Sequence, residues 1–171
     1  MILSLLAAGA AEAVVYSSRE EALARAFPPP ASVERRTWFL TDAQREAASR
    51  NAQSKIESSL LIGYVGVLDG RLLGTAYFET HTVRTMPETL LVLVRPDGSV
   101  GRVEVLAFAE PEDYLPRPPW LRLFEGRRLD GDLSVGRGLA HVTGATLTTR
   151  AIASAVRRVL AVHLLVAAGS P

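Results

Sequence analysis

The chain has 171 residues and a formal net charge of +1, from 19 basic and 18 acidic side chains, and 48% of its residues are hydrophobic. This hydrophobic content argues against a disordered chain, and the length suits a single domain with its own core. The balanced charge argues against a nucleic-acid binder, which needs a basic face. The absence of cysteine excludes disulfides, thiolate metal sites and iron–sulfur clusters.

The first fifteen residues are almost wholly apolar and contain no basic side chain. Ala11-Glu12-Ala13 fits the small-x-small pattern of a signal-peptidase site, which predicts an export signal over residues 1–13 and an extracytoplasmic protein. The alternatives are a retained membrane anchor and a buried N-terminal helix. The apolar run is shorter than the roughly 20 residues of an ordinary membrane-spanning helix.

Two capping boxes predict helices in residues 14–59. In each, a hydroxyl is followed three residues later by a carboxylate or an amide, as at Ser18–Glu21 and Thr41–Gln44. The first helix is expected to end at residue 27, because three prolines follow it, and the second to extend to about residue 58. We therefore expect a helical segment over 14–59 in front of the main domain, residues 60–168.

The middle of the chain alternates between strand-like runs and turn residues. Asp69-Gly70 and Pro96-Asp97-Gly98-Ser99 are tight-turn sequences between apolar runs. Strands joined by such short turns pair antiparallel. The sequence predicts a meander of about four strands between residues 60 and 108.

A proline-rich, irregular stretch over residues 110–120 separates the meander from a predicted C-terminal helix. From Thr149 onward, apolar residues recur at intervals of three and four, at Ile152, Val156, Val159, Leu160 and Leu164. This pattern predicts an amphipathic helix with Arg157 and Arg158 on its solvent side. The fold class is therefore α+β: a central antiparallel β-meander with N-terminal helices and a C-terminal amphipathic helix.

A cluster of small and hydroxyl-bearing residues precedes this helix, namely Thr143, Gly144, Ala145, Thr146, Leu147, Thr148 and Thr149. The first amides of a helix have no intrahelical partner, and together with the helix dipole they favour an anion such as phosphate. The same cluster also suits an ordinary N-cap, in which Thr148 or Thr149 closes the first turn. The residue types alone leave both interpretations open.

Thr143-Gly144-Ala145-Thr146 matches a [Ser/Thr]-Gly-Ala-Thr flavinylation motif, so the chain resembles the FMN-binding domain family. That family includes the flavin subunit of the sodium-translocating NADH:quinone reductase and the G subunit of the Rnf complex. The turns at Asp69-Gly70 and Asp97-Gly98, with the apolar runs after them, also resemble the family's hairpins. The N-terminal part is similar to exported single-domain members.

The resemblance implies that FMN is attached covalently, by a phosphoester, to Thr146. A separate flavin transferase would make this bond, taking FMN from FAD and releasing AMP. The implied protein is an electron carrier and not an enzyme by itself, with redox partner proteins and a possible membrane association. It would relay electrons between a membrane-associated donor and an extracytoplasmic acceptor.

Three further residues are candidates to line the isoalloxazine ring: Tyr77, His81 and Trp120. Each also has a structural interpretation, as a strand residue at the core boundary, a solvent-facing strand residue and a core anchor, respectively. The sequence shows no group of His, Asp and Glu with metal-ligand spacing.

Two other functions stay open. Many family members carry aspartate at the position of Ala140, and without that carboxylate Thr146 would stay unmodified in an interaction or assembly module of the same fold. The third option is a small reductase that binds FMN reversibly. Against it, no G-x-G-x-x-G nicotinamide motif occurs in a strand–turn–helix setting.

Overall fold

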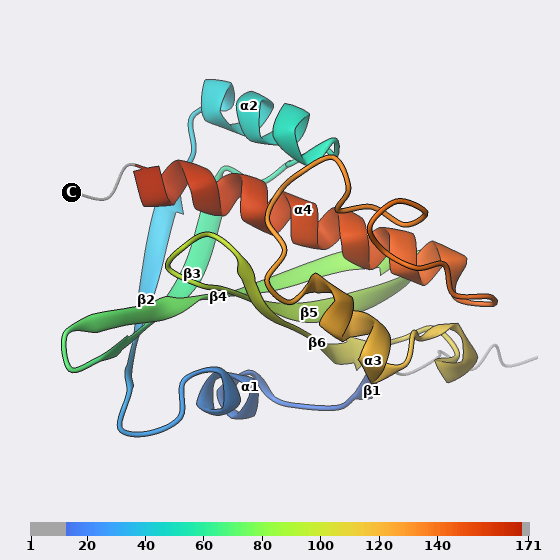
Figure 1. Ribbon diagram of the computed structural model, residues 1–171, viewed down its shortest axis with the longest axis horizontal. Helices are drawn as coiled ribbons and strands as arrows, with labels where there is room; N and C mark the ends of the chain where they lie inside the picture. The colour runs from blue at the N-terminus through green and yellow to red at the C-terminus, as the bar shows by residue number, and fades with distance from the viewer. Residues whose placement is uncertain (1–12, 169–171) are drawn as a thin grey trace, which may run out of the picture.

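The computed structural model describes residues 13–168, so the predicted export signal lies outside the described residues except for Ala13. The strands are β1 (Val14–Val15), β2 (Ser32–Phe39), β3 (Leu60–Leu68), β4 (Arg71–Val83), β5 (Met86–Val94) and β6 (Val100–Phe108). The helices are α1 (Arg19–Ala26), α2 (Asp42–Ala52), α3 (Pro118–Leu121) and α4 (Thr146–Ala168), with 3-10 turns η1 (Glu112–Tyr114) and η2 (Arg122–Phe124). One antiparallel sheet and a long C-terminal helix confirm the predicted α+β class (Figure 1).

The sheet has a helix on each face and runs in the order β1-β6-β5-β4-β3-β2 (Figure 1). On one face α4 packs across the strands through a core that includes Leu90, Val92, Val105, Ile152, Val156 and Leu160. On the other face α1 packs through Ala22, Phe27, Ala76, Leu91 and Leu106. α2 packs against α4, where Ala48 and Ala52 meet Ala161 and Val162.

Both predicted capping boxes form. The N–H of Glu21 donates to Ser18 Oγ at 3.1 Å, and the N–H of Gln44 donates to Thr41 Oγ1 at 3.2 Å. The predicted end of the second helix is wrong, because Gln53 takes a left-handed conformation with φ of 52° and α2 ends at Ala52. The loop that follows leads directly into β3.

The four strands predicted between residues 60 and 108 form as β3 to β6. The sheet has two more strands, because β1 and β2 come from the segment 14–59 that was predicted to be helical. β2 pairs with β3 along its whole length, from Ser32↔Val67 to Phe39↔Leu60. Its sequence, SVERRTWF, does not alternate between apolar and polar residues, since β2 is an edge strand exposed on both faces. Alternation of apolar and polar residues indicates a strand only where one face of that strand is buried and the other faces water.

Strands β3 and β4 diverge along their length. Their pairing begins at Leu68↔Arg71 and stops at Tyr64↔Ala76, although β2 with β3 and β4 with β5 stay paired beyond that point. Residues 60–63 and 77–83 therefore have no strand between them. Figure 1 shows β2 and β3 turning away from the other strands below α4. The sheet is split at this end.

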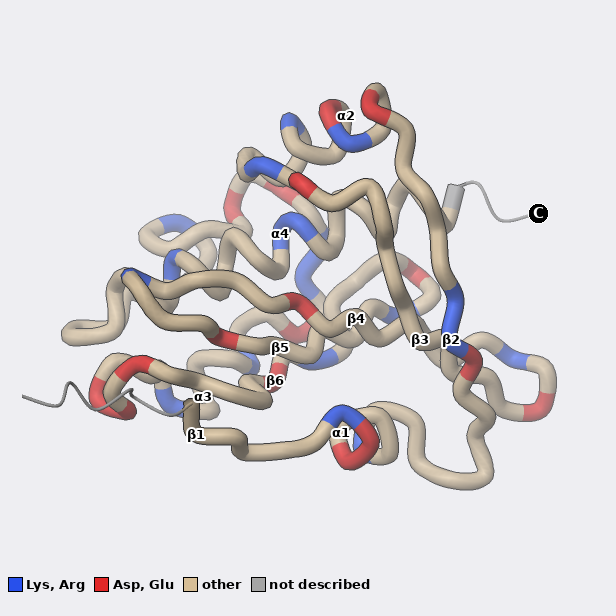
Figure 2. The backbone as a smooth tube through the Cα atoms, turned by 180° about the vertical axis from the view of Figure 1, so that it is seen from behind, with Lys and Arg blue, Asp and Glu red and all other residues tan. Residues whose placement is uncertain are grey.

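Charges are spread evenly over the outer elements. Basic and acidic residues lie side by side along α1, α2 and β2 (Figure 2). Within residues 13–168, none of the helices combines the length and the apolar character that a membrane crossing requires.

Candidate functional site

The flavinylation-like motif forms the turn that begins α4. Thr146 is the first helical residue, so the predicted start at Thr149 is wrong by three residues. Gly144 has a φ of 84°, and the N–H of Ala145 donates to the C=O of Val142 at 3.2 Å. The first helical bond runs from the N–H of Thr149 to the C=O of Ala145, at 2.9 Å. Among residues 13–168, the amides of Thr146, Leu147 and Thr148 therefore have no acceptor.

Neither Thr148 nor Thr149 closes the first turn, so the interpretation as an ordinary N-cap does not hold. Thr149 Oγ1 instead donates to the C=O of Thr146 at 3.0 Å. Thr148 and Thr149 are both buried. The position before the helix is taken by Ala145, whose side chain cannot cap it. The helix start is thus left without a side-chain acceptor from the motif.

The Thr146 hydroxyl is weakly held, and the residue is half-buried. Its one hydrogen bond runs from Oγ1 to the C=O of Val142 and is long, at 3.4 Å. Thr143, Gly144 and Leu147 around it are exposed. A Cβ placed on Gly144 would meet no atom within 4 Å, so the space beside the turn is open. A group joined to Thr146 would meet little steric hindrance here.

Arg150 adds a positive charge on the next turn of α4. Residues four apart share a helix face, which places Arg150 on the same side as Thr146. Its side chain is exposed and forms no ion pair or hydrogen bond with the described residues. The start of α4 therefore combines unpaired amides, the positive end of the helix dipole and a free guanidinium.

Trp120 supports the segment that leads into the motif. Its indole Nε1 donates to the C=O of Ala140 at 2.8 Å, and Arg127 donates to the C=O of Gly138 at 2.5 Å. The Trp120 ring is 6% exposed and packs edge-on against Phe124, with centroids 5.3 Å apart. Trp120 thus fixes the approach to Thr146 and offers no open ring face for stacking on a flavin.

Tyr77 lies far from the motif. Its hydroxyl is within hydrogen-bond distance of Nδ1 of His163, at 2.8 Å, and burial lowers the pKa of that imidazole. His163 is 17 residues after Thr146 in α4, which corresponds to about 25 Å along the helix axis. A flavin joined to Thr146 through its phosphate does not reach that far, so the structure does not bring Tyr77 and Thr146 into one site.

His81 pairs with a buried carboxyl group that the sequence analysis did not find. Its Nε2 is 2.9 Å from Oε2 of Glu88, whose side chain is fully buried. Burial raises the pKa of Glu88, and the contact with His81 offsets this only in part. The signal was the alternation in β5, where Glu88 shares a face with the core residues Leu90 and Val92.

Replacing Glu88 with glutamine is expected to stabilise the fold by about 1 kcal/mol at pH values above the folded-state pKa of this carboxyl, because burial penalises its ionised form. Because the pKa of Glu88 is higher in the folded protein than its ordinary value of 4.5, the free energy of unfolding should fall as the pH rises from 4.5 through the folded-state pKa. The Glu88→Gln variant should lack this loss. Urea unfolding from pH 4 to 8 measures it.

The matched control is Glu79→Gln, which removes the partner of Arg158 and should lower stability. A Glu88→Gln variant that is less stable than the parent across this pH range would contradict the idea that the buried carboxyl of Glu88 destabilises the fold.

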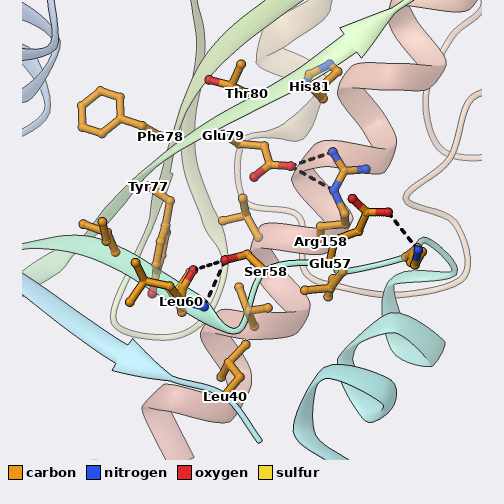
Figure 3. A pocket seen from close by; sticks show the side chains of 16 residues that line it. Leu40, Glu57, Ser58, Leu60, Tyr77, Phe78, Glu79, Thr80, His81 and Arg158 are labelled. Carbon is orange, nitrogen blue, oxygen red and sulfur yellow. Dashed lines mark hydrogen bonds and ion pairs between the residues drawn. The ribbon is translucent and has the colours of Figure 1, made fainter. Parts of the chain in front are cut away.

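Tyr77 and His81 line a pocket of about 500 Å³ that lies in the split between β3 and β4 (Figure 3). In it, Oε1 of Glu79 accepts hydrogen bonds from Nε and Nη2 of Arg158, at 2.9 and 2.6 Å. Residues 143–149 do not line this pocket. The structure thus separates the predicted site residues into two places, the start of α4 and the split in the sheet.

Comparison with family models, curated proteins and solved structures gave no match. Within the described residues, no group of three or more His, Asp or Glu side chains could hold a metal ion. The chain gathers chemically useful groups at two places, the start of α4 and the split between β3 and β4.

Proposed function

We propose that the chain is an electron-transfer protein that carries FMN joined by a phosphoester to Thr146. The observation that carries this proposal is the weakly held Thr146 hydroxyl at the start of a 23-residue helix with three unpaired amides. The match of Thr143–Thr146 to the flavinylation motif supports FMN as the attached group. The carrier would work outside the cytoplasm, between a membrane-associated donor and an external acceptor.

The residues at the start of α4 fit the phosphate end of FMN. A phosphodiester keeps one negative charge, which the unpaired amides of Leu147 and Thr148 and the guanidinium of Arg150 would stabilise. When bound, the flavin supplies the redox chemistry, and the chain supplies attachment, orientation and charge. The aromatic candidates Tyr77 and Trp120 do not lie where they would stack on its ring.

The attachment step is a phosphoryl transfer in which Thr146 is the nucleophile. The Thr146 hydroxyl gives its proton to a base of the flavin transferase, and Oγ1 forms a bond to the FMN phosphorus of FAD. The bond from that phosphorus to the bridging oxygen breaks, and AMP leaves. The covalent bond would keep FMN on the carrier after export. This matters outside the cytoplasm, where no free flavin could replace a lost cofactor.

The test is to co-express the chain with a flavin transferase and to image flavin fluorescence on a denaturing gel. A fluorescent band at the mass of the chain is expected. A dark band would overturn the proposal if a known transferase substrate is labelled in the same cells, and would favour the unmodified assembly module. Flavin that is present before denaturation and lost on the gel would favour reversible binding.

The Arg150→Gln variant should be labelled about threefold more slowly than the parent, since one exposed charge near a helix start contributes about 0.6 kcal/mol. Initial rates of flavin transfer with purified transferase measure this effect. Lys55→Gln removes an exposed charge far along the chain and serves as the matched control. Equal rates for the two variants would show that Arg150 does not act on the phosphate.

A further inference from the structure

The outer edge of β6 has main-chain partners at both of its ends and none in its middle. At one end β1 pairs with it, and the N–H of Tyr16 donates to the C=O of Leu106 at 2.8 Å. At the other end, Val100 exchanges two main-chain hydrogen bonds of 2.8 Å with residues 126–127. Within residues 13–168, the strand that neighbours residues 102–105 is β5 alone.

This gap has the length of a short strand. Successive residues of an antiparallel strand turn their N–H and C=O groups to opposite sides, so two of the residues 102–105 turn theirs toward the gap. Four strand residues span about 14 Å. All four line a pocket of about 530 Å³ along this edge. A strand placed there would continue the row of main-chain pairs that β1 and residues 126–127 begin.

One wall of this pocket is apolar. Val103 and Val105 are buried in the core on the α4 side of the sheet, and Leu115 packs against the same core. Arg122 and Glu125 lie at the end of this wall and carry opposite charges, so together they add no net charge. The apolar residues that form the wall are Leu115, Pro116, Pro118 and Leu121.

The opposite wall is positively charged. Glu104 forms an ion pair with Arg25 of α1 and lies 3.9 Å from Nη1 of Arg102. Two arginines therefore share one carboxylate, and both arginines are exposed. Side chains of a strand alternate between its two faces. A strand in the gap would therefore turn every second side chain toward these arginines and the others toward the apolar wall.

We propose that this pocket binds an extended segment of a partner protein in which apolar residues alternate with acidic ones. The segment would join the sheet as a short strand beside β6, with its main chain giving affinity and its alternate side chains giving specificity. A second copy of the chain does not fit, because its own β6 edge lies at the bottom of the same pocket. The inference does not rest on the attachment of FMN to Thr146.

The test titrates the isotope-labelled chain with the peptide acetyl-Val-Glu-Val-Glu-Val-amide and follows the protein amide shifts. Saturable shifts centred on residues 102–105 are expected. Two N-methylated peptides are compared with it, one methylated at the central valine and one at the glutamate that follows. Since only alternate residues of the peptide face β6, one of the two should bind about tenfold more weakly and the other about as well as the parent peptide.

The Arg102→Glu variant should bind this peptide about fivefold more weakly, because it replaces an attraction with a repulsion at an exposed site. It should also bind acetyl-Val-Lys-Val-Lys-Val-amide more tightly than the parent chain does. Arg71→Glu reverses an exposed arginine that does not line the pocket, and it should leave both affinities unchanged. Circular dichroism checks that both variants fold.

The proposal is overturned if the acidic peptide does not bind, if the shifted amides lie away from residues 102–105, or if both N-methylated peptides bind equally well. Equal affinities of the Arg102→Glu and Arg71→Glu variants would also overturn it. Shifts at residues 102–105 that appear on raising the protein concentration without peptide would identify a second copy as the occupant. None of these outcomes bears on covalent labelling of Thr146.

Discussion

Replacing Thr146 with alanine is expected to abolish covalent flavin incorporation completely. The phosphoester needs an oxygen on the side chain, and alanine has none. Stability should change little, since Oγ1 contributes one long hydrogen bond to the C=O of Val142. The measurement is in-gel flavin fluorescence with intact-protein mass, after co-expression with a flavin transferase. The loss of label in a folded variant would identify the attachment residue.

Two companion variants separate attachment from packing. Thr146→Ser keeps the nucleophilic oxygen and should keep the label. Thr149→Ala loses only the bond from its hydroxyl to the C=O of Thr146, and it should also stay labelled. Label that persists in Thr146→Ala, or that moves to Thr143, would contradict the assignment of the attachment residue.

Replacing Arg157 with methionine is expected to reduce the free energy of unfolding by about 3 kcal/mol, which corresponds to a Tm lower by roughly 6–12 °C. The Arg157 guanidinium is buried and donates only to main-chain carbonyls. Nε bonds Ala52 at 2.8 Å, Nη2 bonds Asn51 at 3.2 Å, and Nη1 bonds Asp130 at 2.6 Å and Leu133 at 3.4 Å. Methionine would leave these acceptors without partners.

Urea unfolding of Arg157→Met against Arg150→Met measures this effect, because Arg150 is an exposed arginine of the same helix and should tolerate the change. Arg157→Lys should recover only part of the loss, since one ammonium group cannot reach all four acceptors on the two segments. Equal stability of the two methionine variants would mean that water replaces the guanidinium at little cost.

Local signals in the sequence predicted the elements whose structure depends on near neighbours. The capping boxes at Ser18 and Thr41, the turns after Asp69 and Asp97, and the apolar stripe of α4 all depend on residues within four positions. The place of Thr146 before a long helix followed from the same kind of pattern. Its exact position as the first helical residue depends on the turn at Gly144, which no periodicity reports.

The features that the sequence did not reveal depend on contacts between distant segments. β2 is a strand because β3 lies beside it, and its own residues carry no alternation. Arg157 was predicted to face solvent. It is buried because it donates hydrogen bonds to the C=O of Ala52, at the end of α2, and to the C=O of Asp130, in the loop at residues 130–133. The His81–Glu88 pair needs the register of β4 with β5. The separation of Tyr77 from Thr146 needs the direction in which α4 crosses the sheet.

The open edge of β2 has a consequence for how the protein behaves at high concentration. A free strand edge can pair with the same edge of another molecule and start aggregation. β2 carries Glu34, Arg35 and Arg36 at its centre, all exposed. A second strand laid against this edge would remove part of the hydration of these charged side chains. The charges on this strand, which obscure any alternation in its sequence, therefore disfavour pairing of the sheet edge with another molecule.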